Sequence, residues 1–207
     1  MLRYAITSRA LYPGENPAQQ TALLRQASGW AADGIDFIQL REKDLPGGEI
    51  AKLARAILQL IESAASSTKL VINSRPDIAI ATGAHGVHLT AAPDELTPIQ
   101  VRDLYGSVGR PEPIITISCH TLEEVRRARD NRVDAILFGP VFEKVVSGQA
   151  IAPGSGLDGL RSACTSAGTI PVYALGGVTQ DNAAACLDAG AAGVAGIRLF
   201  HESQDDC

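Results

Sequence analysis

The stretch Pro-Val-Tyr-Ala-Leu-Gly-Gly-Val-Thr at residues 171–179, followed by Gly-Val-Ala-Gly-Ile-Arg at residues 193–198, decides how the rest of the sequence is interpreted. Each begins as a short apolar run that ends abruptly, the first at Gly176 and Gly177 and the second at Arg198. Strands of a parallel sheet that is covered on both faces have this pattern. Adjacent glycines let a backbone approach a ligand closely and leave amide groups free to bind it. The two runs therefore predict parallel strands with an anion site at their carboxyl ends.

The rest of the sequence repeats this alternation of short apolar runs and longer amphipathic patterns. Predicted strands occupy residues 3–7, 37–40, 70–72, 86–89, 114–118, 135–138, 172–175 and 193–197. Predicted helices occupy residues 18–32, 48–64, 76–81, 98–105, 122–129, 157–167 and 180–189. Eight strand–helix units close a barrel, whereas five or six would form an open sheet. The sequence therefore predicts a single (β/α)8 TIM barrel domain over residues 1–207.

In such barrels, the loops after the seventh and eighth strands often bind phosphate. Here these loops contain Gly176 and Gly177 after one run, and Ile197 and Arg198 after the other. Thr179 is a candidate N-cap for the helix that follows, and a helix N-terminus favours anions. We therefore expect a phosphorylated ligand to bind at these two turns.

Composition limits the classes of function. The formal net charge is −5 and no run of Lys or Arg is present, which argues against a nucleic-acid surface. No apolar run is long enough to cross a bilayer, and the N-terminus lacks the apolar core of a signal peptide. The four cysteines, at positions 119, 164, 186 and 207, have no metal-binding spacing and are interpreted as reduced thiols. We expect a cytoplasmic protein that binds no membrane and no nucleic acid.

The end of the second predicted strand carries several polar residues. Alternation along an extended chain places Gln39, Arg41 and Lys43 on one side, where the two cations could face one anion. The alternative is a solvated charge cluster in a loop.

Candidate site residues also follow the third and fourth predicted strands. Asn73 could contact a ligand or cap the next helix. His88 could contact a ligand or be hydrogen-bonded within the barrel wall. Asp94 and Glu95 could reach a Mg²⁺ ion, which prefers oxygen ligands, or serve as the acidic first turn of the next helix.

The fifth strand ends in Ser118-Cys119-His120, and either Ser118 or His120 could face the barrel mouth. A Cys119–His120 nucleophile pair is disfavoured because adjacent residues of a strand point to opposite sides. Thr121 and Glu124 match a capping box. Residues 143–156 are predicted to form a long loop, either disordered or a lid that contacts ligand through Lys144, Ser147 and Gln149.

Taken in order along the chain, these motifs resemble the thiamine-phosphate synthases and their relatives, the thiazole tautomerases (TenI-type proteins). The resemblance rests on residues 4–7, 39–43, 71–73, 77–79, 86–89, 118–124, 138–142, 176–178 and 189–195. The synthase joins a pyrimidine methyl pyrophosphate to a thiazole phosphate and releases pyrophosphate by a dissociative mechanism. The resemblance implies a small phosphorylated heterocycle as substrate, and it makes a homodimer possible.

The resemblance also assigns roles to residues. Gln39, Arg41, Lys43 and Asn73 would hold the pyrophosphate. The Gly177 amide and the amides around Ile197 and Arg198 would hold the thiazole phosphate, with Arg198 standing where the family pattern has a serine.

The chain also departs from the synthase pattern. Ser74 stands where the synthase has an aspartate that helps to bind Mg²⁺, and residues 90–93 replace a Gly-Gln-x-Asp motif. Residues 144–147 replace the Thr-Pro-Thr-Lys of the synthase loop. Mg²⁺ binding would therefore depend on Asp94 or Glu95. The tautomerase branch also lacks the metal carboxylate, but its proton-transfer histidine corresponds to Pro140 here, which leaves His120 as the nearest candidate.

Three functions remain open at this stage. The preferred prediction is a synthase-like transferase in thiamine biosynthesis, with Arg41, Lys43 and His120 as candidate catalytic residues. The second is a thiazole tautomerase, an isomerase that needs no metal. The third is a barrel without catalysis that binds thiazole phosphate or thiamine phosphate.

Overall fold

The structure is a computed structural model that describes residues 1–92, 94–146 and 149–201. Eight parallel strands form a closed barrel in the order β1-β10-β9-β6-β5-β4-β3-β2. These strands are β1 (Leu2–Ile6), β2 (Phe37–Leu40), β3 (Lys69–Asn73), β4 (Gly86–Leu89), β5 (Ile114–Cys119), β6 (Ala135–Phe138), β9 (Val172–Leu175) and β10 (Gly193–Gly196). The predicted (β/α)8 barrel is confirmed, and each predicted strand lies within two residues of an observed one at either end.

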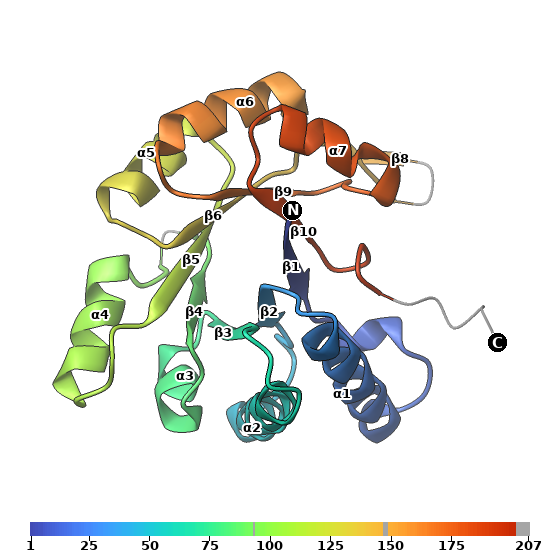
Figure 1. Cartoon of the computed structure of the whole chain (residues 1–207), viewed down its shortest axis with the longest axis vertical. Coiled ribbons are helices and arrows are strands. Elements are labelled where there is room, and N and C mark those ends of the chain that lie inside the picture. Colours follow the sequence, from blue (N-terminus) through green and yellow to red (C-terminus); the bar gives the residue numbers. More distant parts are fainter. Residues whose placement is uncertain (93, 147–148, 202–207) are drawn as a thin grey trace.

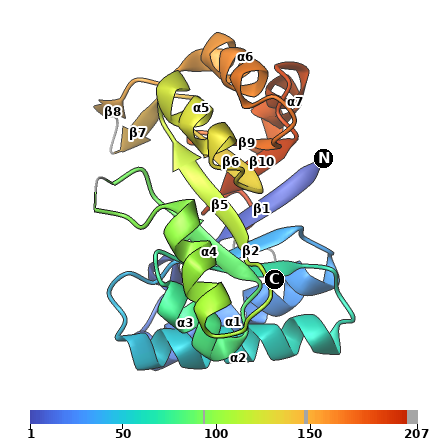
Figure 2. The same ribbon diagram turned by 90° about the vertical axis from the view of Figure 1, so that its left-hand side faces the viewer.

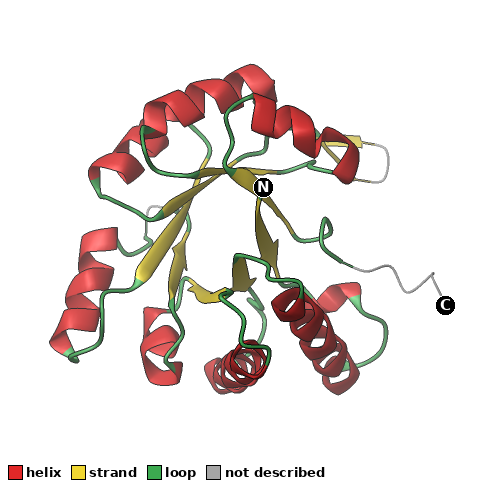
Figure 3. Cartoon of the chain, viewed as in Figure 1, coloured by secondary structure: helices red, strands yellow, loops and turns green. Residues whose placement is uncertain are grey.

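Helices cover the outside of the barrel (Figures 1 and 3). They are α1 (Asn16–Ala32), α2 (Gly47–Ser63), α3 (Pro76–Thr82), α4 (Pro98–Ser107), α5 (Leu122–Asp130), α6 (Gly156–Ala167) and α7 (Gln180–Asp188). The predicted capping box at the start of α5 is confirmed, because Thr121 and Glu124 exchange side-chain and backbone hydrogen bonds. Among the described helices, none is long and apolar enough to cross a membrane.

The core has two parts because side chains alternate along each strand. Side chains of one set point outward and pack under the helices in a large apolar cluster. Side chains of the other set fill the barrel, where Tyr4, Val71, Leu137 and Tyr173 form the central apolar contacts. The ring of Tyr4 packs edge-on against that of Tyr173, with centroids 5.5 Å apart.

The chain after β10 forms no helix as far as residue 201, the last described one. This segment lies between α7 and α1 (Figure 1). The Trp30 indole N–H on α1 donates to the Phe200 carbonyl at 2.7 Å, and the His201 ring packs on Tyr12. These contacts fix the loop after β10 against the first helix.

The prediction of a long loop over residues 143–156 is wrong. Strands β7 (Lys144–Val146) and β8 (Gln149–Ala152) pair antiparallel and form a separate hairpin, and α6 begins at Gly156. Two short paired strands satisfy each other's backbone groups, which a structureless loop would leave to solvent. Of the predicted lid contacts, Ser147 lies outside the described residues. Figure 2 shows this hairpin on the same side of the barrel as the loop between β4 and α4.

A second element that the pattern does not predict is a turn of 3-10 helix, η1 (Arg9–Leu11), in the loop after β1. Arg9 within it is 8% exposed, which is rare for an arginine. Its position follows from a buried ion pair described below.

Candidate active site

A polar column occupies one side of the barrel interior. Gln39, His88 and Thr116 lie on β2, β4 and β5 with 1%, 3% and 0% exposure. The register places His88 beside Thr116. Ser118 lies two residues further along β5, so its side chain points inward as that of Thr116 does. These side chains contact one another, and Tyr4 on β1 completes the column.

The contacts in the column run from the barrel centre to its mouth. The Tyr4 hydroxyl lies 2.9 Å from Thr116 Oγ1 and accepts a hydrogen bond from Gln39 Nε2 at 3.2 Å. His88 Nδ1 lies 2.9 Å from Thr116 Oγ1, and His88 Nε2 lies 3.0 Å from the half-buried Ser118 hydroxyl. The structure therefore favours the interpretation of His88 as a hydrogen-bonded residue of the barrel interior.

Burial and the charge of Arg41 together lower the pKa of His88 to about 3, with burial as the larger cause. Burial raises the pKa of the Tyr4 phenol, against weaker opposing effects of its bonds to Thr116 and Gln39. Both groups therefore stay uncharged at neutral pH.

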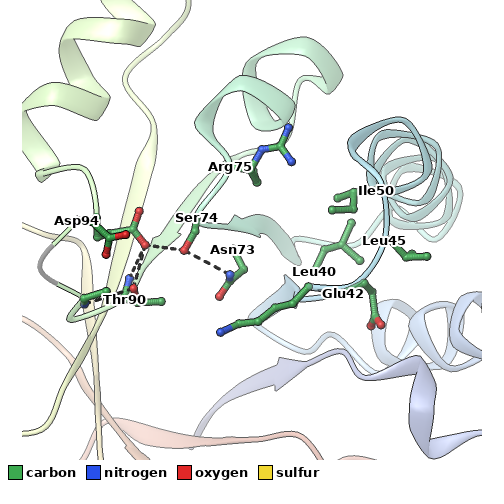
Figure 4. A pocket seen from close by; sticks show the side chains of 12 residues that line it. Leu40, Glu42, Leu45, Ile50, Asn73, Ser74, Arg75, Thr90 and Asp94 are labelled. Carbon is green, nitrogen blue, oxygen red and sulfur yellow. Dashed lines mark hydrogen bonds between the residues drawn. The ribbon is translucent and has the colours of Figure 1, made fainter.

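A pocket of about 420 Å³ opens at the carboxyl ends of β2, β3 and β4. Its walls come from the loops that follow these three strands (Figure 4). The lining residues are Leu40, Glu42, Lys43, Leu45, Ile50, Asn73, Ser74, Arg75, Thr90, Ala92, Asp94 and Glu95.

A chain of hydrogen bonds crosses the floor of this pocket. Asn73 Nδ2 donates to Ser74 Oγ at 3.3 Å, and Ser74 Oγ donates to Glu95 Oε2. The same Glu95 oxygen accepts from the Thr90 amide at 3.1 Å and from the Thr90 hydroxyl at 3.0 Å. The Glu95 carboxylate thus reaches back to Ser74, the position where the synthase pattern has its aspartate. Asp94 is exposed.

Asn73 does not cap the next helix. The N-cap of α3 is Arg75, and no side chain caps it. Instead, Asn73 Oδ1 is buried without a hydrogen-bond partner in the described residues. A buried acceptor without a donor is unfavourable, so this oxygen is available to a ligand donor or a cation.

The alternation predicted after β2 extends only to Leu40, where the strand ends and a turn begins, with Leu45 N donating to the Glu42 carbonyl at 3.2 Å. Gln39 lies inside the barrel, Lys43 lines the pocket, and Arg41 acts on His88 through its charge. Within the described chain, neither Arg41 nor Lys43 is paired with a carboxylate. Two unpaired cations beside an acceptor-lined pocket favour an anionic ligand.

A buried ion pair between Arg9 and Glu42 anchors the loop that carries Arg41 and Lys43. Arg9 Nη1 contacts Glu42 Oε2 at 3.0 Å, and a second arm of the guanidinium binds Asp44. Glu42 is only 5% exposed and also accepts from the Arg9 amide. Figure 4 shows the Glu42 carboxylate turned away from Asn73. The bond to Asp44 is the largest cause of the raised pKa of Arg9, which therefore keeps its charge.

The turns after β9 and β10 lie side by side. Leu175 is opposite Ala195 in the parallel ladder, so Gly177 and Ile197 follow two residues later on neighbouring strands. Among the described residues, no carbonyl accepts from the amides of Gly176, Gly177, Ile197 or Arg198. The two turns predicted to bind phosphate are thus adjacent, with free amide groups. Arg198 is exposed.

The two glycines also have a packing role. Gly176 and Gly177 have φ of +89° and +67°, a region that favours glycine. A Cβ on Gly176 would lie 2.7 Å from Pro140 Cα, and one on Gly177 would lie 2.7 Å from Phe142 Cβ. The loop after β6 is therefore able to pack directly on this turn, and it also donates two backbone bonds to it.

His120 and Cys119 do not form a nucleophile pair. The exposed His120 ring donates from Nδ1 to the Gly139 carbonyl, and its backbone amide donates to Glu124. Cys119 is buried on the outer side of β5, and this burial, with the charge of Glu124, raises the pKa of its thiol to about 12. A protonated, buried thiol is not a nucleophile.

Sequence reasoning missed four residues of the site: Tyr4, Thr116, Arg75 and Thr90. Two of them have a simple positional signal. Thr90 follows His88 by two residues, and Thr116 precedes Ser118 by two, so each shares an inward direction with a residue already selected. The sequence pattern placed Tyr4 in a predicted strand but did not indicate that its hydroxyl belongs to the site. Arg75 pairs with Asp77, in a contact that the sequence does not single out.

A Mg²⁺ ion in this pocket would need oxygen ligands from side chains and substrate. No group of three or more His, Cys, Asp or Glu side chains that could hold a metal occurs in the described part of the chain. Mg²⁺ in phosphate-binding sites is commonly held by one or two carboxylates together with substrate oxygens. Glu95 supplies one carboxylate, and Asn73 Oδ1 supplies a buried oxygen without a partner. These residues fit an ion shared with a bound phosphate group.

The fold and the position of the site define the class of protein. It is a (β/α)8 barrel whose polar site lies at the carboxyl ends of its strands. Residues 4–200 match the family model described as thiamine monophosphate synthase (TMP-TENI), and the chain belongs to this family.

Individual relatives agree with this family. The chain is 41% identical over 206 residues to a putative thiamine-phosphate synthase of Geobacter sulfurreducens, covering 98% of this chain and 87% of that protein. It is 38% identical over 174 residues to a thiamine-phosphate synthase of Moorella thermoacetica, covering 84% and 78%. Among solved structures, a thiamine phosphate pyrophosphorylase from Pyrococcus furiosus superposes with a TM-score of 0.76 at 28% identity, covering 97% of this chain and 88% of that one.

Proposed function

We propose that this protein is a thiamine-phosphate synthase, a transferase that joins hydroxymethylpyrimidine pyrophosphate to thiazole phosphate and releases pyrophosphate. The observation that carries the proposal is the pocket at β2, β3 and β4, which is lined by Lys43 without a carboxylate partner and by Asn73, whose buried Oδ1 has no hydrogen-bond partner in the described residues, in a chain of the synthase family. The proposal also agrees with the names of the two relatives given above, a putative thiamine-phosphate synthase and a thiamine-phosphate synthase.

The reaction breaks the bond between the pyrimidine methylene carbon and the pyrophosphate oxygen. The electron pair leaves with the pyrophosphate, and the thiazole nitrogen then uses its own pair to form the new carbon–nitrogen bond. This dissociative step develops negative charge on the leaving group and requires no proton transfer. Cations positioned before the reaction lower such a barrier. Arg41 and Lys43 are the groups that would stabilise the departing pyrophosphate, and the surrounding side chains would shield the carbocation from water.

The thiazole phosphate would bind at the opposite side of the mouth. The free amides of Gly177 and Ile197 are suited to phosphate oxygens, and Arg198 can add a charge from the surface. In this proposal the two phosphorylated groups would bind beside different strands, and the reacting ends of both substrates would meet above the polar column.

Mg²⁺ would be held by Glu95 and Asn73 Oδ1 together with the pyrophosphate, as derived above. When bound, it would supply further positive charge against the leaving group. The Ser74 hydroxyl would hold the Glu95 carboxylate in place, because it donates to the same oxygen as Thr90 does.

The tautomerase alternative has little support in the site. Pro140 carries no ionisable group at the tautomerase histidine position, and the His120 Nδ1–H is committed to the Gly139 carbonyl. We also propose a homodimer in the cytoplasm, as expected from the family resemblance.

The test incubates the protein with both synthase substrates, with and without Mg²⁺, and follows thiamine phosphate and pyrophosphate. Replacing Lys43 by Met should lower kcat/KM about 10²–10³-fold, the usual effect of removing one stabilising group from a developing charge. The matched control is Lys52→Met, because Lys52 is exposed on α2 and paired with Glu49. Turnover of a thiazole carboxylate tautomer without any thiamine phosphate would replace the proposal with the isomerase, and an unchanged Lys43→Met variant would refute the placement of the pyrophosphate.

A further inference from the structure

The contact between His88 Nε2 and Ser118 Oγ, at 3.0 Å, has the geometry of a serine nucleophile beside its general base. Which of the two atoms carries the shared hydrogen decides whether Ser118 is activated as a nucleophile or serves as a hydrogen-bond donor. The buried contacts on the other side of the imidazole ring decide this question.

We propose that the barrel interior fixes His88 in the tautomer protonated at Nε2, so that His88 donates to Ser118 Oγ and the Ser118 hydroxyl hydrogen is directed to an acceptor atom of the bound substrate. His88 is then a positioning residue that acts through Ser118. This inference rests on the proposed synthase function for the identity of the substrate, but not for the tautomer itself.

The tautomer follows from a count of hydrogens around His88 Nδ1. Three polar atoms form a buried triangle: the Tyr4 hydroxyl, the Thr116 hydroxyl and His88 Nδ1, with separations of 2.9, 2.9 and 3.3 Å. Each hydroxyl brings one hydrogen that needs an acceptor. Gln39 Nε2 adds a further donor, because it donates to the Tyr4 oxygen.

With Nδ1 unprotonated, every hydrogen in the triangle has a partner. One hydroxyl donates to the other, and the second donates to Nδ1. With Nδ1 protonated, three hydrogens point into the triangle and only two oxygens can accept them, so one hydroxyl is left without an acceptor. Tyr4 and Thr116 are both 0% exposed, and with Gln39 Nε2 donating to Tyr4 no further acceptor contacts either hydroxyl among the described residues. An unsatisfied buried hydroxyl is unfavourable, and the Nε2–H tautomer avoids it.

The His88 ring is not doubly protonated at neutral pH, so only one of its two nitrogens carries a hydrogen. Burial and the nearby Arg41 charge lower the pKa of His88 to about 3, so the neutral ring persists at neutral pH. The neutral ring has a single N–H, which the triangle assigns to Nε2. Since Nε2–H donates to Ser118 Oγ, it cannot also accept the Ser118 hydrogen. Ser118, half-buried near the carboxyl end of β5, therefore has its own hydrogen free for the substrate.

The tautomer is measured directly in the ligand-free protein. Two-bond ¹H–¹⁵N correlation spectra of ¹⁵N-histidine-labelled protein distinguish protonated from unprotonated ring nitrogens, and the His88→Gln variant identifies the His88 signals among those of the four histidines. We expect Nε2 protonated and Nδ1 unprotonated. A proton on Nδ1, which a reversed Gln39 carboxamide would permit by accepting from Tyr4, overturns the proposal. This readout needs no substrate, so it stands or fails independently of the synthase reaction.

Kinetics then test the role of Ser118. Gln at position 88 retains a donor near Nε2, whereas Asn retains polar atoms only near Nδ1. We therefore expect His88→Asn to lower kcat about as strongly as Ser118→Ala, on the order of 100-fold. His88→Gln should retain most of the activity. Because His88 acts through Ser118, the double variant His88→Asn/Ser118→Ala should be no slower than either single variant.

A nucleophilic Ser118 would give different results. It would form a covalent pyrimidine adduct, detectable by intact mass spectrometry during turnover, and Ser118→Cys would then retain or increase that adduct. Either a covalent adduct or fully additive losses in the double variant would overturn the donor role. Equal losses in His88→Gln and His88→Asn at matched thermal stability would do so too.

Discussion

The two sides of the barrel mouth are built in different ways. The side-chain arc, defined as the ends of β2, β3 and β4, presents Lys43, Asn73 and Glu95 around a pocket. The backbone arc, defined as the ends of β9 and β10, presents free amides at Gly177 and Ile197. The first arc depends on the identity of its side chains, and the second depends on where the chain turns. The side-chain arc is also where this sequence departs from the synthase pattern, at Ser74 and residues 90–93.

The difference shows how a barrel can change its chemistry at one arc without losing the other. On the side-chain arc, the family resemblance predicts a carboxylate at position 74, and in the structure the Glu95 carboxylate contacts the Ser74 hydroxyl from the next loop. On the backbone arc such an exchange is not available, because the absence of a Cβ at Gly176 and Gly177 is what lets the loop after β6 pack there.

The loop of the side-chain arc should depend for its stability on the buried ion pair between Arg9 and Glu42. Replacing Arg9 by Met leaves the Glu42 carboxylate, 5% exposed, without its ion-pair partner. Breaking a buried pair from one side should reduce the free energy of unfolding by about 3–5 kcal/mol, measured by urea denaturation. The control Arg161→Met breaks an exposed pair with Asp158 and should change stability by less than about 1 kcal/mol. Similar losses in the two variants would show that the Arg9 pair does not support the arc.

The backbone arc should depend on Gly177 as a packing position as well as a turn. Ala at this position is strained by a φ of +67° and places its Cβ 2.7 Å from Phe142 Cβ. Together these effects should reduce the free energy of unfolding by about 3 kcal/mol. Gly34→Ala is the matched control, with φ of +65° and no atom near the added Cβ, and should lose about 1 kcal/mol. If the two variants lose the same stability, conformational strain alone explains the glycine and the packing argument fails.

The polar column beneath the side-chain arc should make stability depend on acid. The ring of His88 takes up a proton below pH 6.5 when unfolded but only near pH 3 when folded, because burial opposes the charge. The unfolded chain thus binds more protons in this window, so the stabilising contribution is fully present above pH 6.5 and is lost as pH falls towards 3.

From pH 7 to pH 5 this ring should account for a loss of about 2 kcal/mol. We expect His88→Gln to lack that part of the loss when urea unfolding is compared at the two pH values. Ser118→Ala removes a neighbour of the ring without removing the ring, and should keep the wild-type dependence. An identical acid dependence in His88→Gln and in the wild type would contradict the buried neutral histidine.

Much of the barrel could be predicted from local patterns. Short apolar runs such as β4, β6 and β9 were located to the residue, because a buried parallel strand is apolar on both faces and ends at turn residues. The turn after β9 was located for the same reason, since Gly176 and Gly177 mark a break that few other residues permit, and its binding of phosphate stays a prediction. Hairpin β7–β8 was missed because three- and four-residue strands within a polar segment give too short an alternation to be recognised.

By itself, the sequence determined the number of barrel strands, their parallel order and many of the residues that could face the mouth. Those features depend on local periodicity, turn chemistry and chain connectivity, all of which can be read from residues close together in the sequence. Only the tertiary structure decided which candidates meet: that Glu95 reaches Ser74, that Arg9 holds Glu42, and that His88 lies in a closed triangle with Tyr4 and Thr116. Such contacts join residues far apart in the chain, and they form because a buried polar atom must find whichever partner the closed barrel brings within reach.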